Sequence, residues 1–273
     1  MSALELPSIL DVRPTASIDK FFDRVEAYRD IDRGYLQDLA LHLVRWYSGN
    51  SESNEFKDNA LERRWYKSLA DGAPDYGVYD ASIYISDVWA CWICYSRKYL
   101  RDLRKHKELI ESHVGQVKKV VDVGCGFGYT TSALKQMFPN AEVIATNLED
   151  TTQIKVARSM CDEYGFRVIS DLSEIGGDVD LVFASEYFEH FLKPISHFFE
   201  VLKATASKSF VIANSFGTTS VGHFHQYRIA HMLIDGKAMS KMFNNALRNS
   251  GYQSLKTKMW NNKPNVWVQR VIS

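Results

Sequence analysis

Three glycines lie within five positions at Gly124-Cys-Gly-Phe-Gly128, between the apolar run Lys119–Val123 and a stretch with helical character from Thr130. Glycine has no side chain, so a ligand can approach the backbone closely at such a turn. In an open parallel sheet, ligands bind outside the carboxyl ends of the strands, beside the first crossover. The type and spacing of these residues therefore predict a nucleotide-type binding site.

A nicotinamide or flavin dinucleotide is one cofactor class that binds at such a turn. Its fingerprint G-x-G-x-x-G would need glycine where this chain has Tyr129. It would also need an acidic residue at the end of the second strand, where this chain has Asn147. Both departures argue against a dinucleotide.

The elements that position this turn are β-prone runs alternating with helical stretches from Gln116 onward. Such alternation indicates a parallel α/β sheet with right-handed crossovers. The two last β-prone runs, Gly251–Trp260 and Val266–Ile272, are joined by a turn-rich loop and predict an antiparallel hairpin. The other predicted strands are Lys119–Val123, Glu142–Thr146, Arg167–Ile169, Asp180–Ala184 and Ser209–Asn214, and the predicted helices are Thr130–Met137, Thr152–Tyr164, Pro194–Ala204 and Ala238–Ser250.

The part before this alternation is predicted to be helical. Ser17 is a candidate cap for a first helix, and apolar residues then recur at spacings of three and four up to Gly72. A helical stretch from Ser82 to His113 is apolar in its first half and basic in its second. We therefore predict an N-terminal helical region, residues 1–113, that acts as a lid, a substrate-binding part or an interaction part, and an α/β domain, residues 114–273. The tryptophans Trp46, Trp65, Trp89 and Trp92 are read either as core or as an aromatic lid.

The glycine-rich turn resembles a known motif. In Val121-Asp-Val-Gly-Cys-Gly-Phe-Gly128, an acidic residue lies two places before the first glycine of a G-x-G-x-G turn, as in class I S-adenosylmethionine-dependent methyltransferases. The block Asp180–Phe191, with the helix after it, is similar to the fourth strand of that family and the segment that follows. The resemblance covers about residues 116–273 and implies an α/β fold with a Rossmann-like seven-stranded sheet, S-adenosyl-L-methionine as cofactor, and enzymatic methyl transfer.

The resemblance also implies which residues bind the cofactor. The turn would lie under the methionine part, Asp122 would hold that region through hydrogen bonds, and Asp171 would accept from the adenine amino group. Asn147 replaces the acid that grips the ribose hydroxyls, with Glu149 or Asp150 as candidate substitutes. Arg97 is read either as a ligand of the cofactor carboxylate or as part of a solvated helix face. The implied cofactor-binding residues are Asp122, Gly124, Cys125, Gly126, Gly128, Asn147, Asp171, Leu172, Ser185 and Arg97.

Candidate catalytic residues follow the fourth and fifth strands. A general base is required only if the acceptor loses a proton on attack. Glu186, His190 and His225 are predicted to be catalytic. The alternatives are that Glu186 caps the following helix and that Glu189 and His190 lie on a surface helix. The other candidates in these two loops are Glu189, His223 and Tyr227.

No metal site is predicted. Cys91 and Cys94 have C-x-x-C spacing, but no second pair lies at ligand distance, which favours buried helical thiols. His223 and His225 would point to one side of an extended segment, but the sequence offers no third ligand, so a substrate-binding loop is preferred.

The acceptor is predicted to be a small molecule or metabolite. The D/N-P-P-Y/F block of DNA amino methylation is replaced by Ser185-Glu-Tyr-Phe, and the Pro-Cys of cytosine C5 methylation does not occur. The basic run Arg97–Lys107 keeps a nucleotide or nucleic-acid acceptor open, against a solvated face neutralised by Asp102 and Glu108. The missing ribose acid motivates a third hypothesis, a non-catalytic methyltransferase-like binding subunit.

Composition sets few further limits. Lys plus Arg equals Asp plus Glu at 33 each, so the overall field steers neither nucleic acid nor anionic membrane. The most apolar window, Ser82–Ser96, is too short for a bilayer, and the first residues lack a signal-peptide pattern. We expect a cytoplasmic protein with no membrane partner, and the sequence leaves the oligomeric state open.

Overall fold

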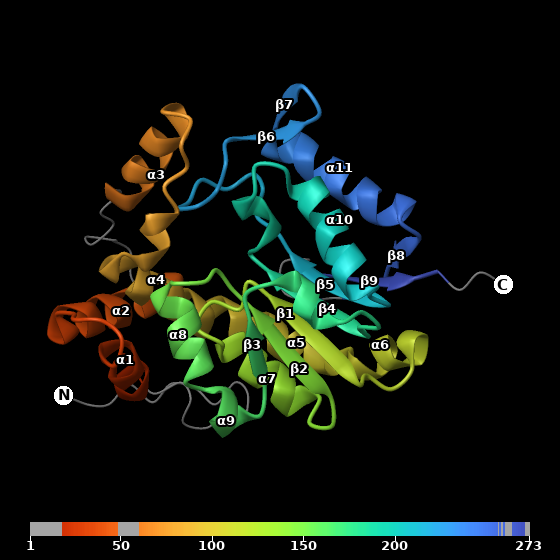
Figure 1. The fold of residues 1–273 in the computed structure, drawn as a ribbon, viewed down its shortest axis with the longest axis horizontal. Coiled ribbons are helices and arrows are strands. Elements are labelled where there is room, and N and C mark those ends of the chain that lie inside the picture. The colour runs from red at the N-terminus through yellow and green to blue at the C-terminus, as the bar shows by residue number, and fades with distance from the viewer. Residues whose placement is uncertain (1–17, 49–59, 256, 258, 260–263, 271–273) are drawn as a thin grey trace.

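The computed structural model describes residues 18–48, 60–255, 257, 259 and 264–270, except the side chains of residues 95–97 and 99 (Figure 1). The predicted cap at Ser17 lies outside the described residues. So do parts of the two runs that were expected to form the C-terminal hairpin.

The centre of the molecule is a seven-stranded sheet with the order β3-β2-β1-β4-β5-β9-β8. Neighbouring strands from β3 through β5 pair in parallel, and β9 runs antiparallel to both β5 and β8. The predicted α/β fold and its C-terminal hairpin are confirmed. The strands are β1 Lys119–Val123, β2 Glu142–Thr146, β3 Arg167–Ile169, β4 Leu181–Ser185, β5 Ser209–Ala213, β8 Tyr252–Ser254 and β9 Asn265–Gln269.

Helices cover both faces of this sheet, as parallel strands require. α7 lies on one face with α5 and α6, and α10 and α11 lie on the other (Figure 1). Strand residues alternate between the two cores: Val120 packs on the α7 side and Val121 on the α10 side. The helices that follow the first strand are α7 Tyr129–Met137, α8 Thr152–Arg158, α9 Cys161–Tyr164, η3 Leu172–Ile175, η4 Phe188–His190, α10 Pro194–Thr205 and α11 Gly236–Asn249.

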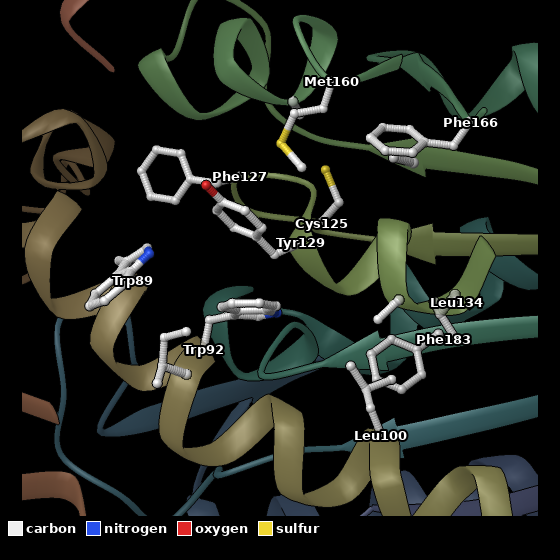
Figure 2. Close-up of a cluster of buried hydrophobic side chains, with 14 of the residues drawn as sticks. Trp89, Trp92, Leu100, Cys125, Phe127, Tyr129, Leu134, Met160, Phe166 and Phe183 are labelled. Atoms are coloured by element: carbon white, nitrogen blue, oxygen red, sulfur yellow. The ribbon is translucent and has the colours of Figure 1, made fainter. Parts of the chain in front are cut away.

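The N-terminal helices share the core of the α7 face, except the helix at residues 60–70 and the turn at residues 76–80, which pack in the other core through Trp65 and Val78. Trp89 and Trp92 face Phe127 and Tyr129, which lie at the start of α7 and in the turn before it (Figure 2). The ring centroids of Trp92 and Tyr129 are 4.5 Å apart, and Phe21 stacks on Trp89 at 5.9 Å. The tryptophans of this group are therefore core residues. These elements are α1 Ile18–Glu26, α2 Arg33–Tyr47, α3 Ala60–Ala70, η1 Tyr76–Asp80, α4 Ser82–Cys91, η2 Trp92–Ser96, α5 Arg97–Lys105 and α6 Lys107–Val114.

Two features differ from the expected elements. The helical stretch Ser82–His113 is interrupted by the π-helical turn η2 and by a break at His106. A second hairpin, β6 Gln226–Ile229 with β7 Met232–Asp235, stands apart from the main sheet and was not expected.

Within the described part of the chain, no helix combines the length and the apolar character needed to cross a bilayer.

Candidate functional site

The glycine-rich turn lies at the carboxyl end of β1, as predicted. Gly124, Gly126 and Gly128 have φ angles of 70°, 56° and 86°, a left-handed conformation that residues with a side chain rarely adopt. The amide of Cys125 donates to the carbonyl of Thr146 at 3.0 Å, which ties the turn to the end of β2. The main chain therefore follows a path that only glycine supports at these positions.

The three glycines differ in what surrounds them. A Cβ at Gly124 would collide with the ring of Tyr187, and one at Gly128 would lie 3.2 Å from the Cβ of Ala157. Among the described residues, a Cβ at Gly126 would meet only Cγ1 of Val88, at 3.9 Å. Packing within the protein thus explains Gly124 and Gly128, whereas Gly126 leaves accessible main chain with space above it.

Asp122 supports the turn from beneath. Its carboxylate is 1% exposed, and its Oδ2 accepts hydrogen bonds from the hydroxyls of Thr130 at 2.7 Å and Thr131 at 2.6 Å. Burial raises the pKa of Asp122 to about 6, although the two hydroxyl donors oppose the rise. Asp122 therefore fixes the first turn of α7 against β1.

The raised pKa of Asp122 predicts a pH-dependent stability. The folded protein disfavours the ionised carboxyl, so Asp122 lowers the free energy of unfolding as pH rises from about 4 to about 6, by up to about 3 kcal/mol. Asp122→Asn should remove this loss. Urea unfolding of the apoprotein between pH 4 and pH 7 should show the variant gaining stability relative to the wild type as pH rises. A difference that stays constant over this interval would contradict the assignment.

Asn147, at the position of the expected ribose acid, closes the glycine-rich turn. Its Nδ2 donates to the carbonyl of Gly126 at 2.8 Å, and its Oδ1 accepts from the amide of Leu148 at 2.8 Å. The candidate substitute Glu149 binds both terminal nitrogens of Arg158, at 2.6 and 2.8 Å, and this pairing lowers its pKa to about 2. The side chains near the expected ribose position are thus already engaged with the protein.

Three further candidate cofactor residues, Asp171, Leu172 and Ser185, lie at or just after the carboxyl ends of β3 and β4. Asp171 is exposed and caps η3 by accepting from the amide of Ser173 at 2.8 Å, and Leu172 beside it is half-buried. Ser185 is half-buried at the end of β4. Arg97 begins α5, and its side chain lies outside the described residues.

Glu186 and Glu189 follow β4. Glu186 has a φ of 48°, and its amide donates to the carbonyl of Ala213 at 2.6 Å. It does not cap η4, because the N-cap of that turn is Tyr187. Glu189 is fully buried, and burial together with the Glu186 carboxylate raises its pKa well above the usual range. The interpretation of Glu189 as a surface helix residue is therefore wrong.

His190 lies next to these carboxyl groups and contacts residues from distant segments. Its Nδ1 is 2.7 Å from the hydroxyl of Tyr79, and its ring centroid is 4.8 Å from that of His223. Burial lowers the pKa of His190 to about 3, so the imidazole is neutral. Sequence reasoning missed Tyr79 as a site residue.

His225 lies apart from this group. Its side chain is exposed and stacks on Tyr66, with centroids 3.9 Å apart. His223, two residues earlier, is 5% exposed and turns inward. The expectation that both imidazoles point to one side is wrong, because the segment is not extended. Tyr227 is fully buried, and its hydroxyl donates to the carbonyl of Glu189 at 3.3 Å.

Part of the chain matches a known protein family. Residues 120–206 match a family model described as a methyltransferase domain. Among solved structures, the chain is similar to the pyocyanin biosynthetic protein PhzM, at 14% identity over 88% of this chain and 77% of that chain, with a TM-score of 0.53. No curated protein sequence matches the chain.

Two further solved structures show weaker likeness. A putative O-methyltransferase from Nostoc punctiforme PCC 73102 is 17% identical over 85% of this chain and 72% of that chain, with a TM-score of 0.47. The bifunctional kinase-methyltransferase WbdD is 15% identical over 64% of this chain, with a TM-score of 0.45. The match spans 39% of the WbdD chain.

Proposed function

We propose that the chain, whose residues 120–206 match a methyltransferase-domain family model, is a class I S-adenosylmethionine-dependent methyltransferase that transfers a methyl group to a small-molecule acceptor. The observation that carries the proposal is the accessible main chain at Gly126, at the carboxyl end of β1, where a Cβ would meet no described atom closer than Cγ1 of Val88 at 3.9 Å. A ligand that needs bare backbone fits there, and the sheet edge is the usual ligand position in such folds.

The residues around Gly126 suit a nucleoside sulfonium. The turn Gly124–Gly128 would contact the methionine part, with Asp122 holding the turn and α7 together from below. Asp171 and Leu172 would face the adenine, and Ser185 and Arg97 complete the proposed set. Because the Asn147 amide is bonded to the Gly126 carbonyl, we propose that Asn147 acts on the cofactor by shaping the turn.

The bound cofactor would supply an activated methyl group for in-line displacement. The work left to the protein is alignment of the acceptor and exclusion of water. Glu186, half-buried after β4, is proposed to accept the acceptor's proton, and neutral His190 to position the acceptor. His225, on the exposed side of its loop, is proposed to act at the entrance of the acceptor site.

The N-terminal helical region is proposed to cover the acceptor. Tyr79 of η1 reaches His190, and Trp65 and Tyr66 of α3 bind the loop after β5 through the carbonyls of His223 and Ser220. An aromatic, half-buried surrounding suits a flat or apolar small molecule. On α5, Lys105 pairs with Asp102 at 3.1 Å, which supports the solvated-face interpretation of the basic run over the nucleic-acid alternative.

Two measurements test the proposal. Calorimetric titration of the full-length protein with S-adenosylhomocysteine should give saturable binding at micromolar concentration or tighter. Incubation of metabolite and nucleotide pools with methyl-labelled cofactor should then shift the mass of the acceptor. Absence of any binding isotherm would reject the proposed activity and favour the non-catalytic alternative. Transfer of the label to a nucleotide would instead show that the acceptor is a nucleotide or nucleic acid.

Glu186→Gln is expected to separate chemistry from cofactor binding. If Glu186 accepts the acceptor's proton, kcat should fall by about 10²–10⁴-fold, while the affinity for S-adenosylhomocysteine stays nearly unchanged. Glu108→Gln, an exposed carboxyl on α6, is the matched control and should leave both quantities unchanged. Equal losses of turnover and cofactor affinity in Glu186→Gln would place this residue in the cofactor pocket instead.

A further inference from the structure

Three side chains with metal-binding chemistry meet beyond the ends of β4 and β5. Glu189 and His190 come from η4, and His223 comes from the loop after β5. One carboxylate oxygen and one nitrogen from each imidazole all lie within 4.8 Å of one another. In the sequence, the two histidines are 33 positions apart, so the fold brings this group together.

Only one of the two oxygens of the Glu189 carboxyl group accepts a hydrogen bond from the described protein groups. Its Oε1 accepts a hydrogen bond from the amide of Ser215 at 2.7 Å. Its Oε2 is buried without a hydrogen-bond donor from the protein among the described residues, and burial together with the neighbouring Glu186 carboxyl raises the pKa of Glu189. A buried polar atom without a partner costs free energy and is rare in native proteins. A cation bound at Oε2 would remove that cost.

Both imidazoles are oriented through Nδ1. In His223, Nδ1 donates to the carbonyl of Thr218 at 2.9 Å, which places the ring's lone pair on Nε2. In His190, Nδ1 is bonded to the hydroxyl of Tyr79 at 2.7 Å. Histidines that bind metals usually have the second ring nitrogen fixed by such a partner, and this contact orients the ligand nitrogen.

We propose that Glu189, His190 and His223 form a binding site for a divalent transition-metal ion of the zinc class. Two imidazoles with one carboxylate suit Zn²⁺ and its neighbours, whereas Mg²⁺ and Ca²⁺ prefer oxygen ligands alone. Three protein ligands leave at least one coordination position open, as in catalytic zinc sites. The site rests on these side chains and does not depend on the proposed methyl transfer.

The test uses Co²⁺ as a spectroscopic substitute for Zn²⁺ on the full-length protein without cofactor. We expect visible d–d bands that saturate at one Co²⁺ per chain and disappear when Zn²⁺ is added. Glu189→Gln and His223→Asn should weaken binding by more than about 100-fold, because each removes a ligand rather than an outer partner. His231→Ala, an exposed histidine in the β6–β7 turn, is the matched control and should bind like the wild type.

A second pair of variants tests the outer partner. Tyr79→Phe keeps the ring and removes the hydroxyl that contacts His190, so Co²⁺ affinity should fall by about 10–100-fold. Tyr76→Phe, on the exposed side of the same turn, should leave it unchanged. Circular dichroism establishes that each variant is folded. If a ligand variant fails to fold, the Co²⁺ spectrum of the wild type and the comparison of Tyr79→Phe with Tyr76→Phe still test the metal site.

Two results would overturn the site. One is a wild-type protein without saturable Co²⁺ bands, which would mean that Glu189 is buried as a neutral carboxylic acid. The other is equal Co²⁺ affinity in the wild type and in folded Glu189→Gln and His223→Asn. Failure here with intact S-adenosylhomocysteine binding removes only the metal site. Metal binding without cofactor binding rejects only the proposed function.

Discussion

Gly126→Val should abolish binding of S-adenosylhomocysteine while the protein still folds. The new side chain would project into the space proposed for the cofactor, since Cγ1 of Val88 is the only described atom within 4 Å of the Cβ position. Steric overlap of about 3 kcal/mol corresponds to a loss of roughly 100-fold in affinity. A side chain at a φ of 56° also strains the backbone by about 1–2 kcal/mol, which a domain of this size can tolerate.

Gly177→Val is the matched control for backbone strain. Gly177 has a φ of 67° and nothing within 4 Å of its Cβ position, and it lies between η3 and β4. Both variants should lose similar stability in chemical denaturation, but only Gly126→Val should lose cofactor binding by calorimetry. Wild-type cofactor affinity in Gly126→Val would mean that the cofactor does not lie against this turn.

Trp65→Ala should be among the most destabilising single substitutions in the chain. Trp65 is fully buried, and its indole Nε1 donates to the carbonyl of His223 at 2.6 Å. The ring also packs edge-on against Phe224 at 5.5 Å. Removing a buried tryptophan leaves a cavity and costs about 3–5 kcal/mol, and the His223 carbonyl loses its donor as well.

Trp65→Phe separates the two contributions. It keeps most of the buried ring and removes the hydrogen bond, so the loss in urea unfolding should be about 1–3 kcal/mol. Because Trp65 holds the main chain at His223, both variants should also change the environment of that imidazole, which NMR of the histidine ring protons would report. Equal stability of Trp65→Ala and the wild type would contradict the packing described here.

Most of the central sheet was predictable because its strands are short apolar runs between glycine and polar turns. β1, β2 and β3 have the predicted bounds, and β4 is displaced by one residue. The hairpin of β6 and β7 was missed for a physical reason. Its two-residue turn is Ala230-His231, and Ala230 adopts a φ of 49° that usually signals glycine or asparagine in a sequence. The strands themselves are largely exposed, so they carry little apolar pattern.

The site was only partly predictable. The glycine-rich turn follows from local spacing, and the position of Glu186 and His190 follows from the end of the fourth strand. The inward turn of His223 depends on Trp65, which lies 158 positions away, and on Gly222, where any Cβ would collide with Tyr79 and His190. Contacts between distant segments of this kind have no local signal, so alternation alone placed both imidazoles on the same side.

The packing of Trp89 and Trp92 on Phe127 and Tyr129 limits how ligands can enter. All four of these aromatic residues belong to one apolar core. An outward rotation of the whole N-terminal half as a rigid body would therefore remove the packing partners of these four rings. Entry of a ligand would then depend on smaller displacements at the rim, where Tyr66 of α3 contacts Ser220 and His225. The rates of ligand entry and release would then depend on a few local hydrogen bonds rather than on the separation of two rigid halves.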